Sequence, residues 1–138
     1  MPVVPENEAV VRRFMTELWS EGDLDVAEEV VAGDHVHLVG DDVLRGPEEV
    51  KGAVVGLRAA FPDLNFEIDD LISDGDRVVL RWTATGTHEG TFADVAPTGR
   101  QVTWIGCDWF RLRAGQLTEA FVVADGGALY EQLTSSEA

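Results

Sequence analysis

The chain of 138 residues has the length of one globular domain, and its 45% hydrophobic and 26% charged residues are ordinary for a protein with a real core. Its formal net charge is -16. Nucleic acids and anionic membrane surfaces would be repelled, because no basic stripe offsets the acidic side chains. We therefore expect neither nucleic acid nor membrane among the partners.

Cysteine usage and the N-terminus bear on where the protein works. The single cysteine, Cys107, allows no internal disulfide. The first residues, MPVVPENEAV, lack a basic region followed by an apolar run, and no stretch approaches the ~18 apolar residues of a membrane span. We expect a cytoplasmic protein that forms one domain over residues 1–138, with its ordered core at about 6–133.

Helical spacing dominates the first half of the chain. A helix is predicted from Glu6 with Gly22 just past its end, and its apolar stripe is Val10, Val11, Phe14, Leu18 and Trp19. A second, short helix is predicted over 24–31 with Asp23 as its cap, followed by a short strand over 34–39. A third helix opens at Gly46-Pro47 and stops at Pro62, with a buried face of Val50, Val54, Leu57 and Phe61.

After Pro62 the period changes from helical to two, which predicts strands. Asp74-Gly75 and Ala114-Gly115 are hairpin signals, and they separate long strands at about 64–73, 77–88, 101–113 and 116–125. Helices first and antiparallel strands afterwards predict an α+β fold. We expect a cone-shaped half-barrel, whose mostly antiparallel sheet encloses a cavity against the helices.

Strand parity predicts which side chains line that cavity. Within 77–88 the apolar face carries Trp82 and ends at His88, and within 101–113 it carries Trp104, Asp108 and Phe110. Asp108 is a carboxylate in the middle of this inner face. Because burial of an unpaired carboxylate is expensive, Asp108 needs a partner, a raised pKa or water.

The last strand has no polar face. If Phe121 points inward and the strand has no bulge, Glu119 and Asp125 point inward with it. Pockets for small molecules are mostly apolar and aromatic. We therefore predict substrate-binding roles for Trp82, Trp104, Phe92, Phe110, Glu119, Phe121 and Asp125.

Several segments resemble one known family. They are VVRRFMTELWSEGDLDVAEEVVAGD, LRGPEEVKGAVVGLRAAFPDL, and the motifs GTHEG, PTGR and WFRLRAGQL. The chain resembles the SnoaL-like polyketide cyclases of the nuclear-transport-factor-2-like superfamily from about Glu6 to Leu133. This resemblance implies a dimeric α+β cone without metal or organic cofactor, and a ring closure by intramolecular aldol reaction of a polyketide ester. It also implies Asp108 as the catalytic acid/base, with His88 beside it.

Two departures from the family pattern leave other functions open. Where many relatives carry a His this chain has Leu38, and where they read Glu-His-Trp it has Glu119-Ala120-Phe121. Those losses favour a non-catalytic small-molecule binder or a dimeric interaction module. An epoxide hydrolase would need an inward Arg, and Arg81 and Arg111 are predicted to face outward. A ketosteroid isomerase would need a pocket Tyr, and Tyr130 lies near the end of the chain.

Three further features complete the predictions. His35 and His37 share one strand face and could bind metal, but no third ligand is evident, so we expect an exposed face and no metal site. Cys107 has no positive neighbour to lower its pKa, so it is not expected to be a nucleophile. Ile105 and Trp109 form an outward apolar patch, which predicts a homodimer interface.

Overall fold

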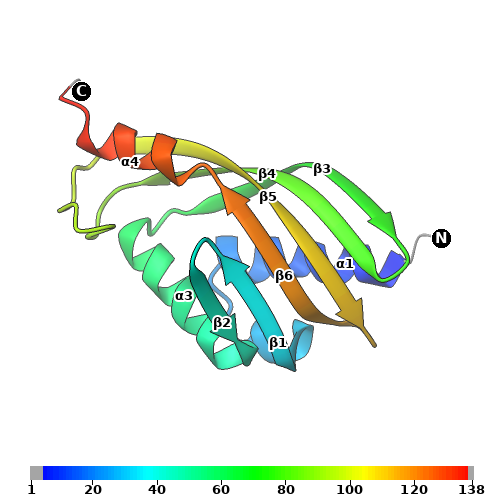
Figure 1. Ribbon diagram of the computed structural model, residues 1–138. Coiled ribbons are helices and arrows are strands. Elements are labelled where there is room, and N and C mark those ends of the chain that lie inside the picture. The colour runs from blue at the N-terminus through cyan, green and yellow to red at the C-terminus, as the bar shows by residue number, and fades with distance from the viewer. Residues whose placement is uncertain (1–4, 137–138) are drawn as a thin grey trace.

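The computed structural model describes residues 5–136 and contains an α+β arrangement of helices on one sheet (Figure 1). In chain order the elements are α1 (Pro5–Arg13), η1 (Phe14–Ser20), α2 (Asp25–Val30), β1 (Val31–Val39), β2 (Asp42–Arg45), α3 (Gly46–Ala60), β3 (Asn65–Asp74), β4 (Arg77–Thr87), β5 (Gln101–Arg113), β6 (Gln116–Ala124) and α4 (Gly126–Thr134). The predicted helices and long strands are confirmed. Strand β2 was not predicted, and β1 begins three residues before the predicted strand.

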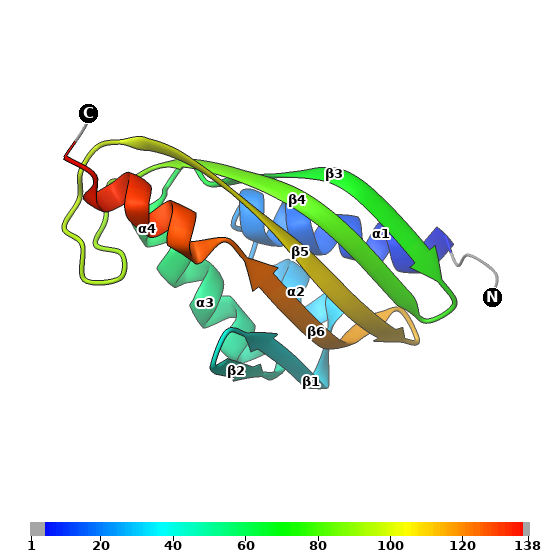
Figure 2. The same ribbon diagram turned by 45° about the horizontal axis from the view of Figure 1, so that its top comes forward.

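The six strands form one curved, unclosed sheet in the order β2-β1-β6-β5-β4-β3 (Figures 1 and 2). Only β1 and β6 run parallel, and every other neighbouring pair is antiparallel. Strands β4 and β5 pair without interruption from Arg77 opposite Arg111 to Thr87 opposite Gln101. The predicted fold class is therefore confirmed.

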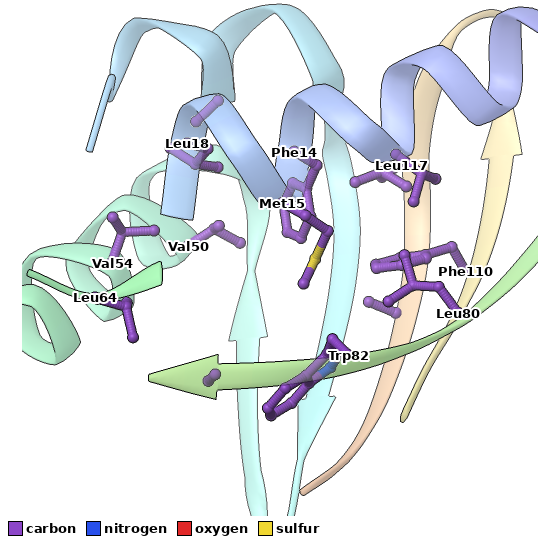
Figure 3. Close-up of a cluster of buried hydrophobic side chains, with 14 of the residues drawn as sticks. Phe14, Met15, Leu18, Val50, Val54, Leu64, Leu80, Trp82, Phe110 and Leu117 are labelled. Carbon is purple, nitrogen blue, oxygen red and sulfur yellow. The ribbon is translucent and has the colours of Figure 1, made fainter. Parts of the chain in front are cut away.

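The helices pack on the concave face of the sheet. Pro47 occupies the first turn of α3, where its missing N–H costs nothing, and Val50 and Val54 of that helix are buried. Helix α1 continues into the π-helical segment η1, which buries three of its side chains. Figure 3 shows the resulting core, in which Phe14 and Met15 face Leu80, Trp82, Phe110 and Leu117 of the sheet, and Leu18 lies on the side of Val50 and Val54 of α3.

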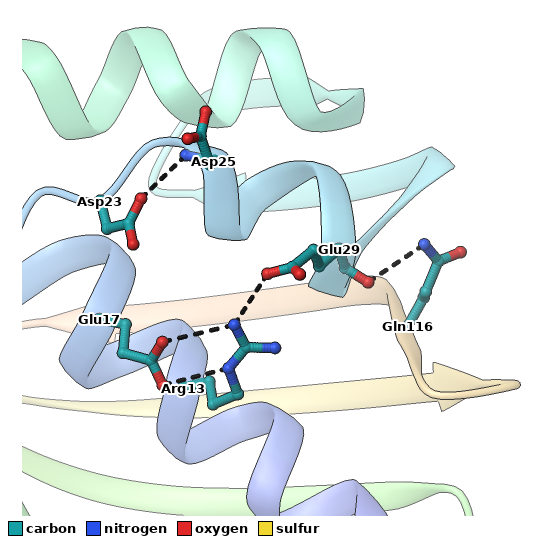
Figure 4. Close-up of polar contacts among 6 residues, drawn as sticks. All are labelled: Arg13, Glu17, Asp23, Asp25, Glu29 and Gln116. Atoms are coloured by element: carbon teal, nitrogen blue, oxygen red, sulfur yellow. Dashed lines mark hydrogen bonds and ion pairs between the residues drawn. The ribbon is translucent and has the colours of Figure 1, made fainter.

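A polar cluster ties the first helices to one another (Figure 4). The guanidinium of Arg13 donates to Glu17 at 3.1 Å and to Glu29 of α2 at 2.8 Å. Both partners raise the pKa of Arg13, with Glu17 the larger cause. Because all three side chains are well exposed, we expect these ion pairs to set the angle of α2 more than the stability of the fold.

A β-bulge in β6 reverses the predicted orientation of that strand. Arg111 lies opposite Glu119 but Leu112 lies opposite Leu117, so Thr118 is an extra residue, and its hydroxyl donates to the Arg111 carbonyl. Beyond the bulge the inward side chains are Ala120, Val122 and Ala124. The prediction that Glu119, Phe121 and Asp125 point into the cavity is therefore wrong, and Phe121 is 51% exposed on the convex face.

That convex face of the sheet is unusually apolar. Ile105 and Val123 are more than half exposed, and Leu38 and Phe121 lie on the same side of the sheet. Trp109 is half-buried there beneath the Arg111 guanidinium, 5.4 Å from its ring. Within residues 5–136 no helix has the length and apolar character needed to cross a membrane.

Candidate active site

A cavity of about 450 Å³ lies between the concave face of the sheet and the helices. This volume falls within the range of small-molecule pockets. Its ionisable lining groups are His37, Asp42 and Asp108. The other lining residues are mostly apolar or aromatic. They are Phe14, Met15, Trp19, Val39, Leu44, Ala53, Gly56, Leu57, Phe66, Trp82, Phe92, Trp104, Val122, Ala124, Gly126 and Leu129. Such a site takes an apolar molecule with few polar atoms.

The cavity has room because small side chains form part of its floor. The bulge turns Val122 and Ala124 of β6 inward and sends Phe121 to the other face. On the opposite wall, the wider turn of η1 brings Phe14, Met15 and Trp19 to the lining. π-Helical turns are frequent at functional sites.

Asp108 is the buried carboxylate of this cavity, and it is only 4% exposed. The indole N–H of Trp82 donates to its Oδ1 at 2.9 Å. Within residues 5–136 its Oδ2 has no hydrogen-bond partner, and this atom is not sealed from solvent. One carboxylate oxygen is therefore held by the protein, and the other is free for a ligand in the cavity.

Burial raises the pKa of Asp108 to about 7, and the Trp82 N–H opposes this rise by stabilising the carboxylate. A carboxyl group with this pKa exists in both protonation states near neutral pH. It can therefore accept and return a proton at one atom, as general acid/base catalysis requires.

Replacing Trp82 with Phe should raise the pKa of Asp108 further. The substitution keeps an aromatic ring but removes the N–H that favours the charged carboxylate. A carboxyl carbon NMR titration of Asp108 measures the change. Trp104→Phe is the matched control, because Trp104 lines the same cavity but makes no hydrogen bond to Asp108. An equal shift in both variants would contradict the role given to the Trp82 N–H.

His88 does not lie beside Asp108, so the predicted pair is wrong. The cross-strand partner of Asp108 is Leu80, which lies eight residues and about 25 Å of extended strand from His88. His88 is fully buried outside the cavity lining, and its Nδ1 accepts from the backbone N–H of Thr98 at 3.1 Å. Its ring packs on Phe61 at 5.6 Å between centroids. Its position is that of an anchor for the 88–100 loop.

The other predicted site residues divide into two groups. Trp82, Trp104 and Phe92 line the cavity as predicted. Phe110 faces inward but lies under Phe14 in the core rather than at the cavity surface. Glu119 and Phe121 face outward, and Asp125 caps α4 by accepting from the Ala128 N–H at 3.0 Å.

His35 and His37 are buried on the concave face, so the expectation of an exposed face is wrong. Nε2 of His35 lies 3.3 Å from Nδ1 of His37, and His37 lines the cavity. Sequence reasoning placed both on one strand face, but it chose the wrong face. The polar His-x-His pattern beside apolar Val36 and Leu38 gave no signal for burial.

Among residues 5–136, the cavity lining lacks the Arg and Tyr side chains that an epoxide hydrolase or a ketosteroid isomerase would use. Within residues 5–136 no Arg or Lys lines it, and Arg81 and Arg111 both face the other side of the sheet, as predicted. Tyr130 is 49% exposed on α4 and is also absent from the lining. In the same described range, no three His, Cys, Asp or Glu side chains are grouped to hold a metal ion.

Comparisons with known proteins identify the family. The sequence profile described as SnoaL-like polyketide cyclase matches residues 9–133. No curated protein sequence matches the chain significantly.

Solved structures agree with that profile. A candidate SnoaL-like polyketide cyclase from Jannaschia sp. CCS1 is similar, with a TM-score of 0.89 at 25% identity over 98% of this chain and 96% of that one. AclR, a candidate hydroxylase from Streptomyces galilaeus, gives a TM-score of 0.83 at 32% identity over 96% and 83%. A candidate polyketide cyclase from Acidithiobacillus ferrooxidans gives 0.82 at 30% identity over 96% and 97%. The chain belongs to the SnoaL-like polyketide cyclase family.

Proposed function

We propose that this protein is an acid/base enzyme that closes a ring in a polyketide-like carbonyl compound by an intramolecular aldol reaction. The observation that carries the proposal is Asp108, a buried carboxyl with one free oxygen in an apolar cavity. Membership of the SnoaL-like family supports the same reaction class.

The proposed chemistry needs one group that both takes and gives a proton. The Asp108 carboxylate removes a proton from a carbon next to a carbonyl, which leaves an enolate. The enolate carbon attacks a second carbonyl of the same molecule, so a C–C bond forms and the attacked oxygen becomes an alkoxide. The protonated Asp108 then returns its proton to that oxygen, and the atoms balance without a co-reactant.

The aromatic walls have a separate role in this proposal. Trp19, Phe66, Phe92 and Trp104 line the cavity, and they fold a flexible chain so that its reacting carbons approach. Exclusion of water by these walls also keeps the pKa of Asp108 near neutrality.

The proposal is tested with a panel of linear and polycyclic polyketide esters in D2O. NMR records binding, deuterium exchange beside the carbonyl, and ring closure. Exchange or a cyclic product in the presence of the wild-type protein is the expected result. Binding of the esters with neither exchange nor product would contradict an enzyme and leave a small-molecule binder.

We also propose that the convex face of the sheet binds a second copy of this chain. Ile105, Phe121 and Val123 are each more than half exposed there, and a shallow hollow lies beside them between Leu38 and Trp109. The same surface of a second copy would bury these apolar side chains about a two-fold axis, as in an isologous dimer.

Phe121→Glu should convert the dimer into a monomer, because two carboxylates would be buried at the two-fold interface. Sedimentation equilibrium measures the mass. Val55→Glu is the matched control, since Val55 is equally exposed but lies on α3, away from the sheet surface. A monomeric wild type, or a Phe121→Glu variant that is still a dimer, would contradict the proposed interface.

A further inference from the structure

His37 is a buried polar side chain that the proposed reaction does not yet use. It is 2% exposed, lines the cavity from β1, and packs against Phe14 at 6.1 Å between ring centroids. A buried imidazole among aromatic and aliphatic side chains is expensive unless its nitrogens are satisfied.

The two ring nitrogens of His37 have different surroundings. Nδ1 faces Nε2 of His35 at 3.3 Å, and one of these atoms donates while the other accepts. Within the described range Nε2 of His37 has no hydrogen-bond partner. Unlike Nε2 of His88, it is not sealed from solvent, so it opens into the cavity.

His37 and Asp108 differ in their pKa values. Burial, and after it the charge on His35, lowers the pKa of His37 to about 3. Burial likewise lowers the pKa of His35 to about 4, against the opposing effect of the Leu117 carbonyl. Both imidazoles are therefore neutral at neutral pH, and His37 offers a hydrogen bond without competing with Asp108 for the proton.

His37 and Asp108 lie on opposite sides of the cavity floor. Strand β6 runs between them, with Ala120 paired to His37 and Val122 paired to Asp108. Two strand spacings separate their backbones by about 10 Å across the sheet. Val122 of β6 lines the same cavity as His37 and Asp108, so an extended ligand can span from one to the other.

We propose that Nε2 of His37 is a second binding contact of the cavity, which holds an oxygen of the substrate at the end opposite Asp108. The inference rests on the proposed function, and it narrows the substrate class. The molecule carries a keto or enol oxygen remote from the carbon that Asp108 deprotonates, as a chain of alternating carbonyls does. His35 is the positioning residue that fixes the His37 ring through Nδ1.

Binding of unreactive probes tests this contact without any turnover. Three naphthalenes of similar size are used, of which 2-acetylnaphthalene only accepts a hydrogen bond, 2-naphthol both donates and accepts one, and 2-isopropenylnaphthalene does neither. We expect His37→Leu to weaken at least one oxygenated probe about tenfold, the value of one hydrogen bond, and to leave the hydrocarbon within about twofold. His37→Gln should recover part of the loss, because its amide both donates and accepts.

The pattern of probes identifies the form of oxygen that is bound. A loss for the ketone means that Nε2 carries the proton and binds a keto oxygen, and a loss for the naphthol without a loss for the ketone means that Nε2 accepts from an enol. Nitrogen-15 NMR of the imidazoles reads the same tautomer independently, and the chain has only three histidines to assign. Oxygenated probes that lose nothing in His37→Leu would overturn the proposal, as would a loss that occurs in Trp104→Phe instead.

His35 is tested by selectivity rather than by affinity alone. His35→Leu should weaken the oxygenated probe more than the hydrocarbon, and His35→Gln, which keeps a polar group near Nδ1 of His37, should restore the difference. Equal weakening of all three probes would mean a merely structural His35 and would overturn its positioning role. Because the probes do not react, a failed cyclisation assay leaves these results intact, and a failed probe assay leaves the acid/base role of Asp108 intact.

Discussion

Asp108→Asn should lower ring closure or α-carbon exchange by about 10²–10⁴-fold while ligand binding is retained. The amide keeps the shape of the carboxyl group and an oxygen that can accept from the Trp82 N–H. It cannot take up a proton near neutral pH, so both proton transfers lose their catalyst. Residual activity near the wild-type rate would contradict the proposed chemistry.

The same substitution should stabilise the fold, and the gain should depend on pH. The pKa of Asp108 is about 7 in the folded protein and about 4 in an unfolded chain, so the folded state binds this proton more tightly. The stability of the wild type therefore falls as pH rises from about 4 to 7, by about 4 kcal/mol if the whole shift is expressed. Asn carries no such penalty.

Chemical unfolding of both proteins at pH 5 and pH 8 measures this effect. The advantage of Asp108→Asn should be larger at pH 8. The lowered pKa values of His35 and His37 act in the other direction, because they cost stability as pH falls below about 6.5. They are present in both proteins and cancel in the difference. A difference that does not change with pH would mean that Asp108 titrates normally.

The sequence allowed good predictions where strand parity was undisturbed. Strands β4 and β5 pair without a bulge, so alternation placed Trp82, Trp104 and Asp108 correctly on the inner face. Helix α3 was equally regular between Pro47 and Pro62. In these elements local period and tertiary packing agree.

The wrong face predicted for β1 has a physical cause, an apolar convex face. In β1 and β6 the larger apolar side chains, such as Leu38 and Phe121, face outward, while His35, His37 and Ala120 are buried on the concave side. Hydrophobicity alone therefore selects the wrong face. In β6 Leu117 faces inward, and the bulge at Thr118 reverses the alternation beyond it, which no sequence period reveals.

The position of His88 depends on a long-range fold-back. The backbone N–H of His88 donates to the Arg100 carbonyl at 2.9 Å, and the Gly99 N–H donates to the His88 carbonyl at 2.8 Å. The chain therefore stays paired at this point and buries the imidazole against Thr98. Pairing across a twelve-residue separation has no local sequence signature.

Gly106→Ala should destabilise the fold, because the new methyl group conflicts with the Trp82 indole. A Cβ at this position would lie 2.6 Å from Cε2 of Trp82 and closer still to Cζ2, because the indole lies flat against the bare backbone of β5. Trp82 cannot simply move aside, since Phe66 contacts its ring edge-on at 4.9 Å between centroids. We expect a loss of about 1–3 kcal/mol and a fall in Tm of about 4–12 °C.

Displacement of the Trp82 ring should also change the pKa of Asp108. Cε2 carries the Nε1–H that donates to Asp108, so a shift of the ring weakens that bond. The pKa of Asp108 should then rise beyond its wild-type value, and a pH–activity profile that depends on the carboxylate should move to higher pH. Loss of stability without this movement would mean that the ring shifts while its bond to Asp108 survives.

Two further variants separate steric conflict from a general intolerance of alanine. Gly33→Ala in β1 has open space around the new Cβ, so its stability should equal or slightly exceed that of wild type. In the Gly106→Ala background, Trp82→Phe removes the ring atoms that conflict, so the double variant should be more stable than the sum of the single effects predicts. If the effects of the two single variants on the free energy of unfolding simply add, Gly106 and Trp82 are not coupled. The position of the Trp82 indole beside Asp108 would then not depend on the absence of a side chain at Gly106.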